Sequence, residues 1–232
     1  MTQPHSRISA CRRGAAREIR AAYRILRRRN GHLHWWPGES AFEVAVGAIL
    51  TQNTAWTNVE KAIAGLAASG ALTCAGIRAL PLPRLAALIR PAGYYRQKAR
   101  KLKCFVRFLD QRYAGSMAAM AQAPPARLRE ELLGVWGIGP ETADSILLYG
   151  CGHLDFVLDA YTRRVAERHG WTGPKASYTQ LQELFVRSLR RDVDLYNDYH
   201  AQIVWVGKHH CRTKPRCGDC PLHPLLPARP GG

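Results

Sequence analysis

The chain has 232 residues, of which 47% are hydrophobic and 22% charged, so it can bury a sizeable apolar core in one large domain or two smaller lobes. Its 34 lysines and arginines against 17 acidic residues give a formal net charge of +17, which favours a polyanionic partner, nucleic acid before an anionic membrane surface, unless it only reflects an arginine-rich composition. The absence of an apolar run of roughly 18–20 residues argues against a membrane span, and seven cysteines, three of them clustered near the C-terminus, argue against a secreted disulfide framework.

Apolar residues recur at helical spacing along the chain, and no segment alternates with the period of a strand. A loose tail is expected over residues 1–13, before a first helix over 15–29. Ser40 and Glu43 have the spacing of a capping box at the start of the next helix. Further helices are predicted around 59–66, over 83–90 and 97–113, on both sides of 135–143, and over 159–169, 177–190 and 192–207. The predicted fold class is therefore all-α.

Two glycines flank an apolar residue between two of these helices, at Gly137, Ile138 and Gly139. Such a turn exposes backbone amides next to the start of a helix, which suits an anion. The arrangement is that of a helix-hairpin-helix, which grips a DNA phosphate without reading sequence. A plain helix connector is the alternative, and Thr142 with the apolar helix after it favours the DNA-binding interpretation.

Asp159 follows the hairpin by about twenty residues and ends a short apolar run. An acid in this place is often only a helix N-cap. Together, the hairpin and Asp159 resemble the endonuclease III (HhH-GPD) superfamily of DNA glycosylases, in which this aspartate is essential. The segment 50–54 resembles the family loop that fills the gap left by a flipped nucleotide, with Gln52 in the wedge position. His200 is expected to pack or to support another side chain, not to act as a base.

The resemblance implies cleavage of an N-glycosidic bond after the damaged base has been rotated out of the duplex. The transition state resembles an oxocarbenium ion, and the carboxylate of Asp159 would stabilise its charge and orient the nucleophile. Bifunctional relatives carry a lysine two residues after the second hairpin glycine, which forms a Schiff base. Glu141 stands there in this chain and cannot form an imine. We therefore expect a monofunctional glycosylase that uses water, with Asp159 and Glu141 at the catalytic site.

Within the superfamily the chain is most similar to 3-methyladenine DNA glycosylase III. The similar segments are 35–37, 50–56, 93–99 and 137–144, and Glu141 belongs to the last of them. An N3-alkylated adenine is cationic and favours aromatic faces. Trp56 with either Trp35 or Trp36 is the candidate base sandwich, unless these rings only pack a junction between lobes. Lys98, in the third segment, is expected among the DNA contacts.

Cys211, Cys217 and Cys220 lie where the family carries its iron–sulfur loop. Four thiolates would hold a [4Fe–4S] cluster. The family spacing is typically C-x6-C-x2-C-x5-C, whereas here the first gap is one residue shorter and Leu226 takes the fourth place. A cluster, a Cys3His zinc site and a loop without metal all remain open. Candidate fourth ligands are His209, His210, His223, Cys11 and Cys151. The loop would hold Lys208, Arg212, Lys214 and Arg216 toward the DNA backbone.

The resemblance implies two helical lobes with a DNA cleft between them. The expected parts are an N-terminal tail and helix over 1–39, a bundle with the hairpin over 40–154, and a lobe with the cysteine loop over 155–232. The expected protein is a cytoplasmic, nucleoid-associated monomer that binds double-stranded DNA and excises an alkylated purine. An endonuclease III-like enzyme for oxidised pyrimidines or mismatches, with or without lyase activity, is one alternative. A non-catalytic DNA-binding module is the other.

Overall fold

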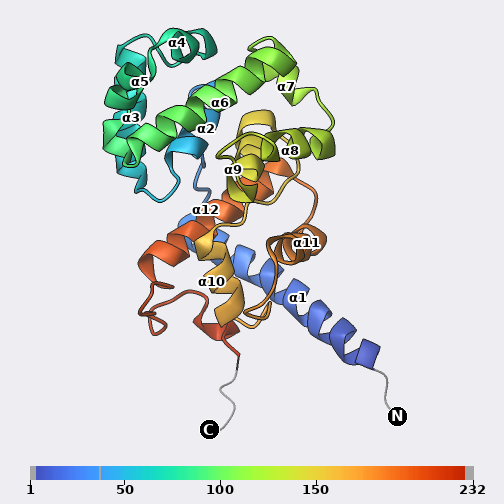
Figure 1. Ribbon diagram of the computed structural model, residues 1–232. Helices are drawn as coiled ribbons and strands as arrows, with labels where there is room; N and C mark the ends of the chain where they lie inside the picture. Colours follow the sequence, from blue (N-terminus) through green and yellow to red (C-terminus); the bar gives the residue numbers. More distant parts are fainter. Residues whose placement is uncertain (1–3, 37, 228–232) are drawn as a thin grey trace. The chain divides into compact units, whose positions relative to one another are not determined.

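The computed structural model describes residues 4–36 and 38–227, and the side chains from residue 14 onward within them. Every regular element in this part of the chain is a helix, and no strand occurs there (Figure 1). The predicted all-α class is confirmed.

The chain divides into two compact units. Unit 1 combines Met1–Trp35 with Phe156–Gly232, and unit 2 is Trp36–Asp155. The boundaries therefore fall at residues 35 and 155, where the sequence suggested 39 and 154. Trp35 and Trp36 are neighbours in the chain but belong to different units.

Unit 2 is a bundle of mostly short helices around one apolar core, to which Ile49, Leu102, Phe105 and Ile146 contribute fully buried side chains. Its helices are α2 (Ala41–Leu50), α3 (Trp56–Ala68), α4 (Cys74–Ala79), α5 (Leu82–Leu88), η1 (Arg90–Ala92), α6 (Tyr95–Tyr113), α7 (Met117–Ala121), α8 (Pro125–Leu133), α9 (Pro140–Ser145) and the π-helix η2 (Ile146–Gly150). The helix α6 packs against α2, α4, α5 and α7. The short helices α4 and α7 were not predicted from the sequence.

The start of α2 shows half of the expected capping box. Ser40 Oγ accepts a hydrogen bond from the Glu43 amide at 3.2 Å, as predicted. The Glu43 carboxylate instead accepts from the amide of Glu39 at 3.3 Å. The serine therefore fixes where the helix begins, while the glutamate holds the residue before the cap.

Unit 1 packs its helices around an aromatic core. Its helices are α1 (Pro4–Asn30), α10 (Ala160–Arg168), α11 (Tyr178–Ser188), α12 (Val193–His209) and the short η3 (His223–Leu225). Phe156 and Phe185 stack with ring centroids 4.6 Å apart, and Tyr199 lies edge-on to Phe156 at 6.0 Å. The helix α1 begins at Pro4, so the expected loose tail is wrong for residues 4–13, and residues 1–3 lie outside the described residues.

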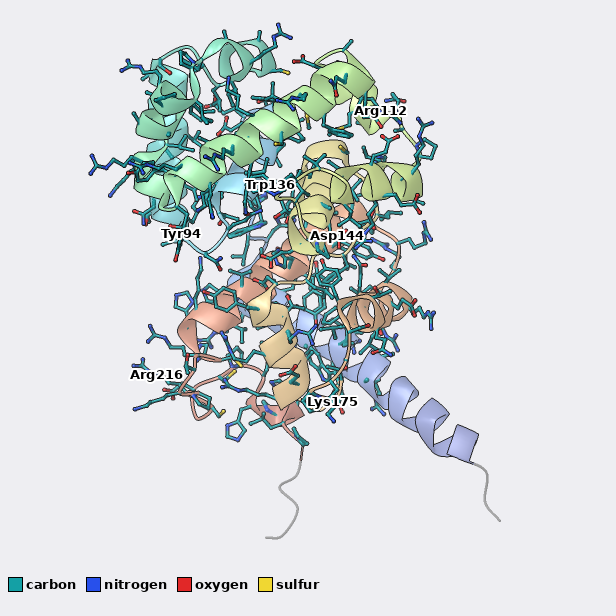
Figure 2. The ribbon with its side chains drawn as sticks, in the orientation of Figure 1. Tyr94, Arg112, Trp136, Asp144, Lys175 and Arg216 are labelled. Carbon is teal, nitrogen blue, oxygen red and sulfur yellow. The ribbon has the colours of Figure 1, made fainter. Side chains whose placement is uncertain are left out.

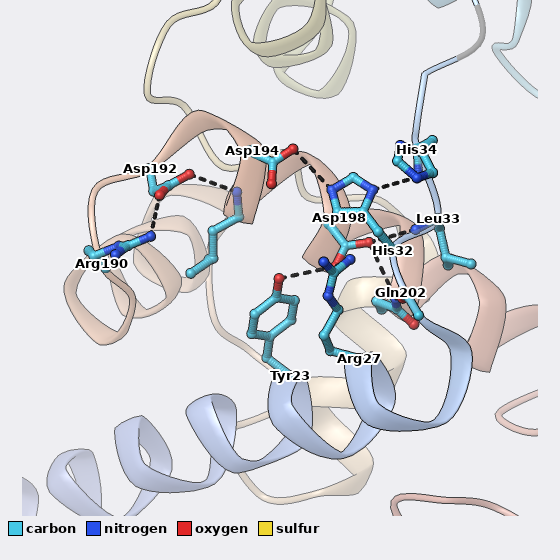
Figure 3. Close-up of polar contacts among 12 residues, drawn as sticks. Tyr23, Arg27, His32, Leu33, His34, Arg190, Asp192, Asp194, Asp198 and Gln202 are labelled. Carbon is cyan, nitrogen blue, oxygen red and sulfur yellow. Dashed lines mark hydrogen bonds and ion pairs between the residues drawn. The ribbon is translucent and has the colours of Figure 1, made fainter.

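A buried carboxylate ties α1 and the segment after it to α12 (Figure 3). Asp198 has no exposed surface, and it accepts hydrogen bonds from Tyr23 Oη at 3.0 Å and Arg27 at 3.3 Å. It also accepts from the amide of Leu33 at 2.9 Å and from Gln202 Nε2 at 3.3 Å. The hydrogen bond from Leu33 fixes the backbone two residues before Trp35. The Asp198 network therefore positions the segment that leads to Trp35.

We predict that Asp198→Ala lowers the free energy of unfolding by about 3 kcal/mol, because it leaves one buried and three half-buried donors without their acceptor. Asp194→Ala is the control, since Asp194 lies on the same helix and contacts His32 while its side chain is 75% exposed. That change should stay within about 0.5 kcal/mol. Urea unfolding measures both, and equal effects for the two variants would contradict the role given to Asp198.

Candidate functional site

The predicted hairpin is present between α8 and α9. Gly137 has φ +88°, a left-handed conformation that glycine adopts without strain, and Ile138 is 5% exposed, which anchors the turn in the core. Gly139 is extended, with φ −98° and ψ 179°, and a Cβ placed there would meet no atom within 4 Å. Trp136, just before the turn, is 55% exposed (Figure 2). The hairpin therefore has a buried apolar side and an open side next to Gly139.

Gln52 lies in the turn that follows α2, and its side chain is bonded to the hairpin. Gln52 Nε2 donates to the carbonyl of Gly137 at 3.0 Å and to Thr142 Oγ1 at 2.9 Å. Its Oε1 accepts from Lys101 Nζ on α6. The structure thus brings together Gln52, the hairpin and Thr142, and it adds Lys101, which no sequence motif indicated.

Lys98 is buried and is not accessible for a direct contact with DNA. Its side chain is 2% exposed, and its Nζ donates to the carbonyls of Leu50 and Ala92, each at 2.8 Å. Burial, with a smaller contribution from Lys101, lowers the pKa of Lys98 to about 8. The prediction of a DNA contact is therefore corrected: Lys98 holds the C-terminal end of α2, the helix end from which the Gln52 turn begins.

Asp159 is the N-cap of α10, and its two carboxylate oxygens have different neighbours. Oδ1 accepts from the Thr162 amide at 2.7 Å and from Thr162 Oγ1 at 2.8 Å. Oδ2 faces His200 Nε2, on α12, at 3.7 Å. Burial opposes ionisation, but the interactions with His200 and Thr162 outweigh it, so the pKa of Asp159 lies below its usual range. Asp159 is therefore an N-cap whose carboxylate is held in its charged form.

His200 extends the Asp159 site to an aromatic ring. Its side chain is buried, and its ring meets Trp35 edge-on, with centroids 6.5 Å apart. Lys208 Nζ lies 5.9 Å from the centroid of the Trp35 ring, so this ring is placed beside a positive charge. Asp159, His200 and Trp35 form a contiguous group within unit 1.

Trp36 and Trp56 contact each other in unit 2. Their rings meet edge-to-face with centroids 4.8 Å apart, and Trp36 also stacks on Tyr149 at 5.0 Å. Both rings pack near Gly47 of α2, where a Cβ would come within 3.3 Å of Trp56 and 3.5 Å of Trp36. This contact leaves no room for a base between Trp36 and Trp56 in the DNA-free structure, so Trp35 is the better candidate for a wall of the base pocket.

Glu141 lies in the first turn of α9 and is exposed, two residues after Gly139. Thr142 beside it is only 6% exposed, in keeping with its bond to Gln52. On α6, Lys98 is buried and Lys101 is bonded to Gln52. The hairpin region thus presents a carboxylate at position 141, while these lysines have structural partners.

The cysteine loop brings its three thiols to one pocket without arranging them as a metal site. Cys211, Cys217 and Cys220 line it, and so does Leu226, at the place of a fourth cysteine. The pocket's remaining lining residues are Arg168, His169, His210, Arg216 and His223. In the described part of the chain no group of three or more His, Cys, Asp or Glu side chains is arranged to hold a metal ion.

Cys211 Sγ instead accepts from Arg168 at 3.3 Å, and burial raises the pKa of Cys220. Among the other suggested ligands, Cys151 and His209 do not line the pocket, and the Cys11 side chain lies outside the described residues. Among the described residues the pocket has three thiols, so these residues do not fit a cluster held by four thiolates. The four cations expected beside the loop are all exposed: Lys208, Arg212, Lys214 and Arg216.

No helix among the described residues is both long enough and apolar enough to cross a membrane.

The HhH-GPD family model, described as "HhH-GPD superfamily base excision DNA repair protein", matches residues 46–191. This range contains Gln52, the hairpin and Asp159. The chain belongs to the HhH-GPD superfamily of base excision DNA repair proteins, and it is a DNA glycosylase of that family.

Individual relatives agree with this assignment. The chain is 45% identical to a Methanocaldococcus jannaschii protein named "Putative DNA repair glycosylase MJ1434", over 86% of this chain and 91% of that protein. It resembles the structure of Helicobacter pylori 3-methyladenine DNA glycosylase bound to 1,N6-ethenoadenine, with a TM-score of 0.72 and 26% identity over 84% and 97% of the two chains. An endonuclease III–DNA complex shares the fold with a TM-score of 0.77 at 23% identity, over 91% and 95%.

We predict that Gly137→Ala destabilises the protein by about 1–3 kcal/mol, because a side chain is strained at positive φ. The added Cβ would also lie 2.4 Å from Cγ of Lys101. Gly139→Ala is the matched control, since its backbone is extended and its surroundings are open. Thermal unfolding should separate the two variants, and similar losses of stability would show that the hairpin does not depend on the conformation of Gly137.

Proposed function

We propose that this protein hydrolyses the N-glycosidic bond of a flipped alkylated purine such as 3-methyladenine, and that it lacks lyase activity. The observation that carries the proposal is the pair of carboxylates: Asp159, held ionised beside His200, and Glu141, in the place of the family's lysine. We further propose that the protein acts as a monomer on double-stranded DNA, and that it works in the cytoplasm in association with the nucleoid.

The carboxylate of Asp159 supplies negative charge as the glycosidic bond breaks and positive charge grows on the sugar. Thr162 fixes one of its oxygens, so the carboxylate does not need to reorient during the reaction. The other oxygen, beside His200, is the one that would face the sugar or a water molecule. Water then attacks the anomeric carbon and the base departs, leaving an abasic site.

DNA would be held by the residues around the hairpin. Gly139 leaves room for a backbone to approach, and Gln52 lies against the same turn to fill the gap left by the flipped base. The residues of the hairpin region that we assign to DNA binding are Gly137, Ile138, Gly139 and Thr142, with Ile138 acting as the buried anchor.

Trp35 supports an alkylated purine as the substrate. A 3-alkylated adenine carries positive charge and binds best over an aromatic face. Lys208 already places an ammonium group near the Trp35 ring, and Asp159 is close to the same ring through His200. Such a base is also a good leaving group, so a strong general acid is not required. The similarity to the Helicobacter pylori enzyme is consistent with this substrate class.

We predict that the wild-type protein releases 3-methyladenine from duplex DNA but not thymine glycol, and does not act on a mismatch. Asp159→Asn should lower the single-turnover rate about 100-fold or more while keeping a good N-cap. Asp192→Asn is the control, because Asp192 caps α12 through the Leu195 amide in the same manner. Release of thymine glycol or of a mismatched base would reassign the substrate. Failure to release any of these bases would favour a non-catalytic DNA-binding module.

We also predict that borohydride traps no covalent adduct between this protein and DNA with an abasic site, because Glu141 cannot form an imine. An endonuclease III, for which a trapped covalent DNA intermediate is known, is the positive control. Gel electrophoresis after reduction measures the adduct. A wild-type adduct that disappears when a single lysine is replaced would show that the enzyme is bifunctional.

A further inference from the structure

In the DNA-free protein, both the nitrogen and the oxygen of the Gln52 side-chain amide are hydrogen-bonded. Its nitrogen donates to both Gly137 O and Thr142 Oγ1, and its oxygen accepts from Lys101. An amide nitrogen has two hydrogens to donate, so these bonds use both. The two kinds of partner also fix which way the amide points, because exchanging its nitrogen and oxygen would place donors against the ammonium of Lys101.

Lys101 contacts the hairpin with its stem as well as Gln52 with its charge. A Cβ built on Gly137 would lie 2.4 Å from Lys101 Cγ and 2.7 Å from Cδ, so the lysine passes directly over this glycine. One turn earlier on α6, Lys98 holds the carbonyl of Leu50 at the end of α2. The helix α6 therefore holds the Gln52 turn at its base through Lys98 and at its tip through Lys101.

We propose that Lys101 is a positioning residue for Gln52. Its ammonium holds the Gln52 side chain against the hairpin, so that the wedge and the phosphate-binding turn meet DNA as one preset surface. A long side chain that is ordered before binding loses less conformational entropy on binding, which raises affinity by about three- to tenfold. This inference rests on the proposed function, because it needs Gln52 to enter the DNA.

A double-mutant cycle tests the proposal. The measurement is the preference for a duplex with a tetrahydrofuran abasic-site analogue over the undamaged duplex, taken from the two dissociation constants. Lys101→Met should lower this preference about three- to tenfold, and Gln52→Ala should lower it as well. In the Gln52→Ala background, Lys101→Met should have no further effect, because the side chain it positions is gone.

Lys103→Met is the matched control, since it removes the same charge from the same helix. Lys103 Nζ donates to the carbonyl of Arg78 at 2.8 Å, away from the hairpin, so the preference should stay unchanged. Thermal unfolding verifies that each variant is folded. If Lys101→Met does not fold, Lys101→Gln, which keeps a stem over Gly137, is used with the same expectation.

Two results would overturn the proposal. If Lys101→Met lowers the preference equally with and without Gln52, Lys101 acts on DNA binding independently of Gln52. An unchanged or increased preference in Lys101→Met would show that the bond to Gln52 does not assist binding. A wild-type protein that does not prefer the abasic-site analogue would instead count against the proposed function itself, so the two failures can be told apart.

Discussion

The ammonium group of Lys98 is enclosed in unit 2, and it must find its hydrogen-bond partners there because a buried charge without them is costly. Its partners are the carbonyls of Leu50 and Ala92, one at the end of α2 and one in η1. The same constraint operates in unit 1, where the buried carboxylate of Asp198 takes the amide of Leu33 as a partner. In each unit a buried charge fixes the backbone just before a residue with a candidate function, Gln52 or Trp35.

Both the backbone conformation of the hairpin and the packing around it require a glycine at position 137. The turn needs a left-handed conformation there, and the stem of Lys101 passes so close that no side chain would fit. Gln52 then bonds to the carbonyl of this glycine. The hairpin thus holds the side chain of Gln52, which we assign to filling the gap left by the flipped base. The open surface at Gly139 lies one residue beyond Ile138, which holds the turn in the core.

Membership of the HhH-GPD superfamily explains why the hairpin and Asp159 occur in one chain, but their geometry explains how each works. Asp159 uses one oxygen to start α10 and directs the other toward His200. Capping thereby aims the carboxylate, and the interactions with His200 and then with Thr162 outweigh burial and lower its pKa. The neighbouring tryptophans separate, since Trp35 joins this group while Trp36 packs against Trp56.

The sequence by itself determined the helical class, the start of α2 at Ser40, the hairpin at Gly137 and the place of Asp159 at the start of α10. These features depend on helical periodicity, side-chain caps and glycine conformation, all of which act over a few residues. Only the tertiary structure decided that Lys98 is buried, that Trp36 and Trp56 fill each other's space, and that His200 and Lys101 are partners of Asp159 and Gln52. Those outcomes join residues up to 49 positions apart, because burial and pairing of polar groups depend on which distant helices pack together.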